Sequence, residues 1–423
     1  MTTGESTYRT VLWRVVFPIT AMIVLSSIDR VNISFAALRM NADIGLDPAA
    51  YGLGASLFFV GYIACQLPSA AVLRRIGARR WIAFSVIGWG VTAALMGLVT
   101  NRTQFFGLRV LLGVFESGFA PGTVWYISQW LPRAYRARSL SLSMVAIPLS
   151  VVIGGPICGA LVSLGSSTLP GWRLMFFVEG AVTVLAGFAA LAWFVDRPDQ
   201  AKWLDADQRR WIAEAAEAET AAGGGAEAPP FSRLIRTPRL WVCAFLWFVL
   251  VTASNAMVFW LPLTIKAAGQ HDPLVIGVLS ALPWAALGTG LLLNARHSDR
   301  TGERRWHVGI AAVLGASGLA LAAFAGPSAA ALAILVVGCF GIGGAQSVFW
   351  AIPTESPLTR HAQAIVTINL VGNLSGLIVP AAIGRVVAAT GSTAMPIYAL
   401  AALTLCAVPL LAILGRGSVR PAV

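Results

Sequence analysis

Long apolar stretches recur along the whole chain and are separated by short polar or charged breaks. Most run for roughly 20 residues or more, which is about the length that a helix needs to cross ~30 Å of hydrocarbon. A transmembrane β-barrel would instead alternate apolar and polar residues over strands of ~10 residues, and the chain does not. We therefore predict twelve membrane-spanning helices, at 12–38, 50–73, 79–100, 103–130, 138–164, 172–195, 239–266, 272–295, 306–326, 328–352, 362–389 and 394–415.

The composition supports a helical membrane protein. Of 423 residues, 57% are hydrophobic and only 11% are charged, whereas soluble proteins carry about 25% charged residues. The first apolar stretch follows no basic segment and shows no small-residue cleavage site, so we expect a retained helix and not a signal peptide. The fold class that we predict is all-α, with twelve transmembrane helices.

Arginine positions predict the orientation. The basic loops contain Arg74, Arg75, Arg79 and Arg80, then Arg133, Arg136 and Arg138, then Arg296, Arg300, Arg304 and Arg305. The intervening loops are short and poor in basic residues. Because basic loops stay in the cytoplasm, we expect these loops and both termini there. The net charge of +12 therefore indicates loop asymmetry, and we expect no nucleic-acid partner.

A single long hydrophilic segment divides the chain. We predict a bundle of six helices at 1–195, a cytoplasmic linker at 196–238 and a second bundle at 239–423. Within the linker, Asp205 to Glu219 has helical spacing and predicts an amphipathic helix. The stretch "GGGAEAPP" that follows is typical of a flexible connection.

The two halves carry the same loop at the same place. "RRIGARRW" (Arg74 to Trp81) lies between spans two and three, and "DRTGERRW" (Asp299 to Trp306) lies between spans eight and nine. Two bundles of six helices with a matching loop indicate a parallel repeat, which is the layout of the major facilitator fold.

Several motifs resemble the major facilitator superfamily and, within it, the anion:cation symporter family. They include "IDRVNISFAAL" (Ile28 to Leu38), "LRVLLGVFESGFAPG" (Leu108 to Gly122), "GWRLMFFVEG" (Gly171 to Gly180) and "INLVGNLSGLIVP" (Ile368 to Pro380). That family includes bacterial permeases for tartrate, phthalate and sugar acids. The resemblance implies alternating access and a gating role for the repeated loop, at Arg75, Gly77, Arg79, Asp299, Arg300, Gly302 and Arg304.

Four charged residues lie well inside the predicted spans: Asp29 and Arg30 in span one, and Arg109 and Glu116 in span four. Charges at this depth are functional candidates. Arginine binds a carboxylate with two parallel hydrogen bonds, whereas a carboxyl group can carry a proton. The resemblance implies proton coupling at Asp29 and Glu116 and substrate binding at Arg30 and Arg109. The alternative is that these residues form neutralised structural pairs.

Weaker candidates for substrate binding are polar or aromatic residues at membrane depth: Tyr62, Asn255, Gln346, Trp350, Asn369 and Asn373. Hydrogen bonding between helices is an equally ordinary use of the amides, and packing is the commoner use of the two aromatic residues. Glu179 lies near one end of span six, where we favour a structural role.

These observations favour a proton-coupled importer of a small organic anion, such as a sugar acid, a hydroxy-dicarboxylate or an aromatic acid. A drug/proton antiporter is the alternative, although two buried arginines suit a cationic drug poorly. An enzyme is disfavoured because no phosphate-binding lysine motif or paired-histidine site occurs. The five cysteines lie in apolar segments without metal-ligand spacing. We expect no metal, no cofactor beyond the proton gradient, and a monomer in the bacterial inner membrane.

Overall fold

The computed structural model describes residues 3–222, 231–354, 359 and 361–416, which form helices and turns with no strand among them. The predicted "GGGAEAPP" connection lies outside the described residues. The helices of the first half are α1 (Thr3–Val11), η1 (Leu12–Val16), α2 (Phe17–Asp43), α3 (Pro48–Ile76), α4 (Ala78–Met96), α5 (Arg102–Glu116), α6 (Phe119–Trp130), α7 (Arg133–Ser163) and α8 (Gly171–Trp193).

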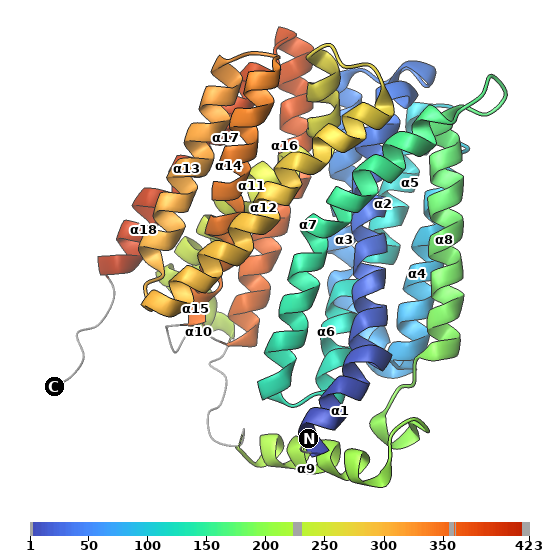
Figure 1. Ribbon diagram of the computed structural model, residues 1–423, viewed down its shortest axis with the longest axis vertical. Coiled ribbons are helices and arrows are strands. Elements are labelled where there is room, and N and C mark those ends of the chain that lie inside the picture. Colours follow the sequence, from blue (N-terminus) through green and yellow to red (C-terminus); the bar gives the residue numbers. More distant parts are fainter. Residues whose placement is uncertain (1–2, 223–230, 355–358, 360, 417–423) are drawn as a thin grey trace.

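The linker contains η2 (Pro198–Gln200), α9 (Ala206–Ala222) and α10 (Phe231–Ile235). The second half is built from α11 (Pro238–Ala267), α12 (Pro273–Thr301), α13 (Arg305–Phe324), α14 (Ala329–Phe349), α15 (Ala351–Thr354), α16 (Ala362–Thr390), α17 (Ala394–Leu405) and α18 (Ala407–Arg416). Figure 1 shows the two halves side by side, with the N-terminus and α9 at one end of the molecule. We call that end the terminal side and the opposite end the far side.

Eleven stretches of helix in the described residues are long and apolar enough to cross a membrane. The remaining span of the fold is α4, whose 19 residues include Arg79 and Arg80 in the first turn and which packs against α8. The fold is therefore the predicted arrangement of twelve helices in two halves. Three spans are interrupted, at Ser117–Gly118, at Trp350 and at Cys406, where one helix ends and another begins.

The first span begins earlier than predicted. Helix starts at Thr3, not near residue 12, because residues 3–11 pack on α9 of the linker. Gly4 lies against the ring of Trp211, and Gln208 donates a hydrogen bond to Ser6. The predicted linker helix is present, and it lies across the terminal side of the first half (Figure 1).

The two halves meet at the far side. Three hydrogen bonds cross between them in the described residues: Tyr51 to the Phe259 carbonyl, Lys266 to the Leu38 carbonyl, and the Ala381 amide to Ser56. All join segments near the far ends of α2, α3, α11 and α16. The halves are thus closed at the far side.

Glycines allow helices of the two halves to approach each other closely at this closure. Gly155 and Gly159 of "GGPICG" lie on α7 against the carbonyls of Gly277 and Pro273 on α12, where a Cβ at either glycine would overlap the carbonyl oxygen. On the other flank, Gly52 of α3 lies in the same way against the Pro380 carbonyl of α16. Small residues allow backbones to approach in a membrane. The glycine motif of span five therefore packs helices together, and it does so between the halves.

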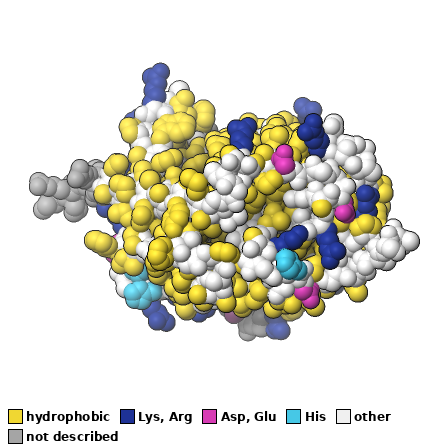
Figure 2. All heavy atoms as spheres, turned by 90° about the horizontal axis from the view of Figure 1, so that it is seen from above, with side chains coloured by type: hydrophobic (Ala, Val, Ile, Leu, Met, Phe, Trp, Pro, Cys, Tyr) yellow, Lys and Arg dark blue, Asp and Glu magenta, His cyan; other side chains and the backbone are white. Residues whose placement is uncertain are grey.

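The far face carries few charges. Figure 2 views the molecule from this side and shows hydrophobic side chains over most of its rim, with scattered basic and acidic groups. Basic residues are denser in the loops of the terminal side, as their positions in the sequence indicate.

Candidate functional site

Helix α2 presents polar side chains on two different faces near its middle. Ser26 and Arg30 are four residues apart and share one face, whereas Asp29 and Asn32 share another. Adjacent residues of a helix point about 100° apart. The neighbours Asp29 and Arg30 therefore contact different helices and do not bond each other.

The first face of α2 forms an ion pair with α5. Arg30 donates through a terminal guanidinium nitrogen to Oε1 of Glu116, and the Ser26 hydroxyl donates to the same oxygen at 2.6 Å. The Glu116 carboxylate is 4% exposed, whereas the Arg30 side chain is 32% exposed. The Arg30 Nε is buried and has no hydrogen-bond partner. The partly exposed side chain could therefore bind another acceptor, although a bond to the buried Nε would require the side chain to shift.

Aromatic rings of α3 cover this pair. The Arg30 guanidinium carbon lies 5.3 Å from the ring centroid of Phe58 and 5.7 Å from that of Tyr62, and the two rings stack on each other. These are cation–π distances. Tyr62, a residue that the sequence singled out, thus lies beside Arg30, and so does Phe58, which the sequence did not single out.

Arg109 also lies over the ring of Phe58, 5.2 Å from its centroid. It is 1% exposed and donates to the backbone carbonyls of Gly54 and Ala55, at 3.1 and 3.3 Å. Arg109 and Glu116 are both buried residues of α5, but Arg109 ties α5 to α3 while Glu116 binds Arg30. In this conformation Arg109 therefore contacts α3 and not the Glu116 carboxylate.

Asp29 lies on the second face of α2 and is 3% exposed. Its Oδ2 accepts hydrogen bonds from Trp89 Nε1 of α4, at 3.0 Å, and from the Thr183 hydroxyl of α8, at 2.9 Å. The structure therefore separates the two predicted proton-coupling acids. Glu116 lies beside the arginine, and Asp29 lies behind α2, among neutral donors.

The polar residues of the second half form two groups. Gln346 donates to the Leu250 carbonyl and the Ser254 hydroxyl, and Asn255 donates to Ser375 at 2.6 Å, so both join helices of one half. Asn369 and Asn373 share a face of α16, are half-buried and have no hydrogen bond to other residues that the structure describes. Trp350 packs on Trp247, with ring centroids 4.8 Å apart.

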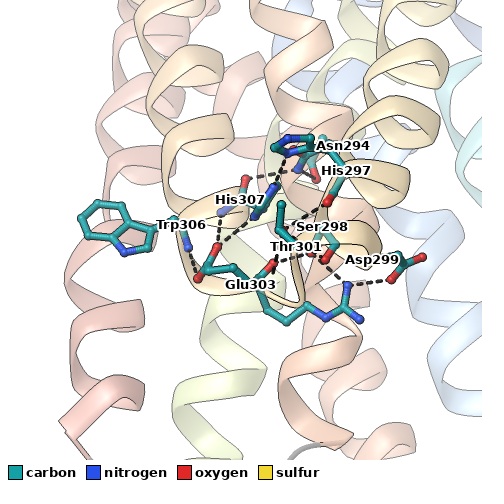
Figure 3. A network of polar contacts seen from close by, with 10 residues as sticks. Asn294, His297, Ser298, Asp299, Thr301, Glu303, Trp306 and His307 are labelled. Atoms are coloured by element: carbon teal, nitrogen blue, oxygen red, sulfur yellow. Dashed lines mark hydrogen bonds and ion pairs between the residues drawn. The ribbon is translucent and has the colours of Figure 1, made fainter.

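The repeated loops form compact turns on the terminal side. In the second copy, Gly302 ends α12 with a left-handed φ of 70°. Arg304 bonds Asp299 and the Ser298 hydroxyl, as Figure 3 shows for the turn between α12 and α13. Arg300 is exposed. The same turn holds a chain of contacts from Glu303 through His307 to His297, with atoms 2.9 and 2.7 Å apart (Figure 3).

The first copy of the loop obtains its acid from elsewhere in the chain. Its acidic position is Arg74, but Asp196, just after α8, accepts a hydrogen bond from the Arg79 amide at 2.9 Å. Gly77 has a φ of 86° and lies against the same carboxylate, so a side chain there would be strained and crowded. Arg75 is exposed. No pattern near Arg74 could predict Asp196, because 122 residues separate the two positions.

An apolar cavity of about 150 Å³ lies apart from this site, between helices of the second half near the far side. Its lining includes Met257, Trp260, Leu319, Leu335 and Leu400 and contains no charged residue. A cavity of this kind offers nothing to balance an anion's charge. The charged residues of α2 and α5 are therefore the better candidate site.

A helical bundle in two halves, with buried charges between its first spans, is the architecture of a secondary transporter, not of an enzyme. The Major Facilitator Superfamily model matches residues 19–380. The chain belongs to that superfamily.

Two relatives and one solved structure show the range of similarity. The chain is 40% identical to a putative tartrate transporter of Agrobacterium vitis, over 97% of this chain and 91% of the relative. It is 33% identical to a quinolone resistance transporter of Acinetobacter baumannii, over 92% and 90% of the two chains. The fold matches a bacterial homologue of the human lysosomal transporter Spinster, in an inward-facing and occupied conformation. The TM-score is 0.78 at 16% identity, over 98% and 99% of the chains.

Proposed function

We propose that this transporter takes up a small organic anion together with protons. The observation that carries the proposal is Arg30, whose guanidinium is partly exposed, holds Glu116 and still has an unpartnered Nε donor. A guanidinium with free donors suits a carboxylate. The similarity to a putative tartrate transporter supports an anion such as a hydroxy-dicarboxylate.

The pairing of Arg30 with Glu116 offers a way to couple the two ligands. An ionised Glu116 competes with an incoming carboxylate for the same guanidinium. A proton on Glu116 weakens that competition, since a neutral carboxyl is a poorer partner for arginine. Proton uptake then favours anion binding, which is the linkage that symport requires.

The second half would supply contacts to the rest of the substrate. Asn369 and Asn373 are the stronger candidates because their amides have no partner in the described structure. Gln346 and Asn255 already bond to neighbouring helices and would have to exchange those bonds. Arg109 and Trp350 complete the set of residues that we propose to contact substrate or to move with it.

We propose that the terminal side faces the cytoplasm of a bacterial cell and that the chain acts as a monomer in the inner membrane, driven by the proton gradient without a cofactor. The density of arginine in the loops of that side supports the orientation. A reporter that is active only in the cytoplasm should work when fused after Val423. Activity of a periplasm-only reporter at that position would reverse the topology.

The direct test is uptake by purified protein in liposomes, with L-tartrate and a panel of sugar acids and aromatic acids as probes. An inward proton gradient should drive accumulation of at least one of these anions, and a proton ionophore should abolish it. If the protein exchanges the anion without a gradient but does not accumulate it when a proton gradient is imposed, it is an anion carrier and not a proton symporter.

The alternative is efflux of a drug in exchange for protons, and the similarity to a quinolone resistance transporter favours it. Expression in a strain that lacks its own efflux pumps should then raise resistance to quinolones. The buried arginines argue against a cationic drug but leave room for a compound with a carboxylate, which the same guanidinium would bind. Resistance without any uptake of the organic anions would replace our first proposal by this one.

A further inference from the structure

Two buried carboxyl groups in the first half have only neutral partners. They are Asp29 of α2 and Glu179 of α8, which are 3% and 8% exposed, and we call them the acid pair. Neither forms an ion pair with any residue in the described part of the chain. Sequence alone favours a structural role for Glu179, but its surroundings differ from those of a structural ion pair.

The acid pair is joined through crossed hydrogen bonds between α2 and α8. Asn32, three residues after Asp29, donates to Oε2 of Glu179 at 2.8 Å. Thr183, four residues after Glu179, donates to Oδ2 of Asp29 at 2.9 Å. Each helix therefore contributes one acid and one neutral donor, and the hydrogen bonds form two clusters between the same helices, one around each acid.

Each acid also accepts a hydrogen bond from a third helix. Trp89 of α4 donates to Asp29 at 3.0 Å, and the thiol of Cys158 on α7 donates to Oε1 of Glu179 at 3.1 Å. Both side chains are fully buried. Four helices thus enclose two acids with an indole, an amide, a hydroxyl and a thiol, and with no cation.

The charges of this region balance only with a proton. Among the described residues of the first six spans, the buried charged side chains are Asp29, Arg109, Glu116 and Glu179, and Arg30 forms an ion pair with one of them. A buried charge without a partner is costly. With every group ionised the region would carry one uncompensated negative charge, and one bound proton removes it.

A proton is expected to bind to the acid pair in preference to Glu116. Glu116 already has the charge of Arg30 beside it, whereas the two members of the acid pair have none. The titratable groups that face the acid pair are Cys158 on α7 and, across α2, Glu116 on α5. Both are neutral or acidic, so neither stabilises two carboxylates.

We propose that Asp29 and Glu179 hold one proton between them and that Glu179 is thereby a third proton-carrying residue of this transporter. The proposal rests on the proposed proton symport for its role in transport. Its structural content, a shared proton behind α2, does not depend on which substrate is carried. Helix α2 lies between this proton and the anion site. A movement of α2 would therefore change the surroundings of both.

The first experiment detects the proton itself, without substrate. Infrared difference spectra of the full chain in lipid nanodiscs, stepped from acidic to alkaline pH, should contain the C=O stretch of a protonated buried carboxyl group. The band should be lost or displaced in both Asp29→Asn and Glu179→Gln. A wild-type protein without the band, or a band that is unchanged in Glu179→Gln, would overturn the proposal.

A milder variant guards against misfolding. Cys158→Ser keeps both acids and replaces a weak thiol donor by a stronger hydroxyl donor. Because a stronger hydrogen bond to the carboxyl group lowers its stretching frequency, the band should move to lower wavenumber in this variant. A band at the wild-type frequency would mean that the proton is not on Glu179, and it would overturn the assignment of Glu179 as a proton carrier.

The second experiment tests whether this proton couples transport to the proton gradient. With L-tartrate as the probe, Glu179→Gln should retain most of the wild-type counterflow but lose accumulation driven by a proton gradient. Gradient-driven accumulation at the wild-type level would remove Glu179 from coupling. If the wild type moves none of the tested anions, the proposed function fails, and the infrared result still decides whether the acid pair holds a proton.

Discussion

Asp29 and Arg30 are neighbours in the sequence and lie on different faces of one helix. Arg30 binds Glu116 on α5, while Asp29 accepts donors from α4 and α8. Two charges at membrane depth would be expensive on an isolated helix. Here each has partners on a different neighbouring helix, so a single short motif supplies both a candidate anion-binding group and a candidate proton carrier.

Replacing Arg30 by lysine tests the anion-binding group. The substitution keeps the positive charge but loses the planar fork that binds a carboxylate in two places. Charge-assisted hydrogen bonds contribute about 1.5–3 kcal/mol, so the loss of one should weaken binding roughly tenfold or more. Titration of the purified variant with L-tartrate by calorimetry measures this. Wild-type affinity would place the substrate elsewhere.

Glu116→Gln tests the competition for Arg30. The amide mimics a protonated carboxyl, so Arg30 is released, and we expect the variant to bind the anion at least as tightly as the wild type. Binding should also lose most of its dependence on pH, and accumulation driven by a proton gradient should fail. Ser26→Ala provides the control, since it removes a neutral donor to the same oxygen and leaves the charges in place.

The helix ends and turns supply the next level of organisation, and the repeated loop is the clearest case. In the turn between α12 and α13, the Glu303 carboxylate accepts hydrogen bonds from the amides of Trp306 and His307, at 2.8 and 3.2 Å. It also contacts the His307 ring. These bonds begin α13 in the way that a capping residue does. Partial desolvation raises the pKa of Glu303, but the hydrogen bonds outweigh it and lower the pKa below its ordinary value.

Glu303→Gln should therefore destabilise the protein in a way that depends on pH. A lowered pKa in the folded state means that the stabilisation is present above the ordinary carboxyl pKa and is lost as the pH falls through the folded value. We expect a melting temperature roughly 1–3 °C below the wild type at neutral pH, and a smaller difference near pH ~4. Thermal unfolding of the two proteins in detergent at both pH values measures it. An equal difference at both would rule out the charge of Glu303 as the cause.

Sequence patterns predicted the elements better than their contacts. The apolar runs located the twelve spans, and the charged residues of spans one and four located Arg30 and Glu116, because length and polarity are properties of each segment alone. The donors around Asp29 could not be predicted. Trp89 and Thr183 are 60 and 154 residues away in the chain, and neither is unusual in an apolar helix. Asp196, which bonds the first copy of the loop, and Phe58, whose ring lies near both arginines, were missed for the same reason.

At the scale of the whole molecule, the two halves form a single closure on the far side. The crossing contacts are glycine against backbone carbonyl on both flanks, between α7 and α12 and between α3 and α16. Backbone contacts of this kind are sensitive to a single added side chain. No ion pair among the described residues joins the halves, and Lys266 is the one charged group in the three hydrogen bonds that cross between them. A closure held in this way is suited to opening and closing during transport.

Gly52→Leu should weaken this closure and favour the state that is open on the far side. A side chain at Gly52 would overlap the Pro380 carbonyl of α16, and overpacking of this kind costs about 1–3 kcal/mol in the closed state. A change of about 1.4 kcal/mol shifts the ratio of two conformations tenfold. Hydrogen exchange measured by mass spectrometry should therefore increase in the far-side ends of α3 and α16. Gly107→Leu is the matched control, because it adds the same side chain to another span where nothing lies within 4 Å. Equal exchange in the two variants would mean that the glycine contact does not hold the halves together.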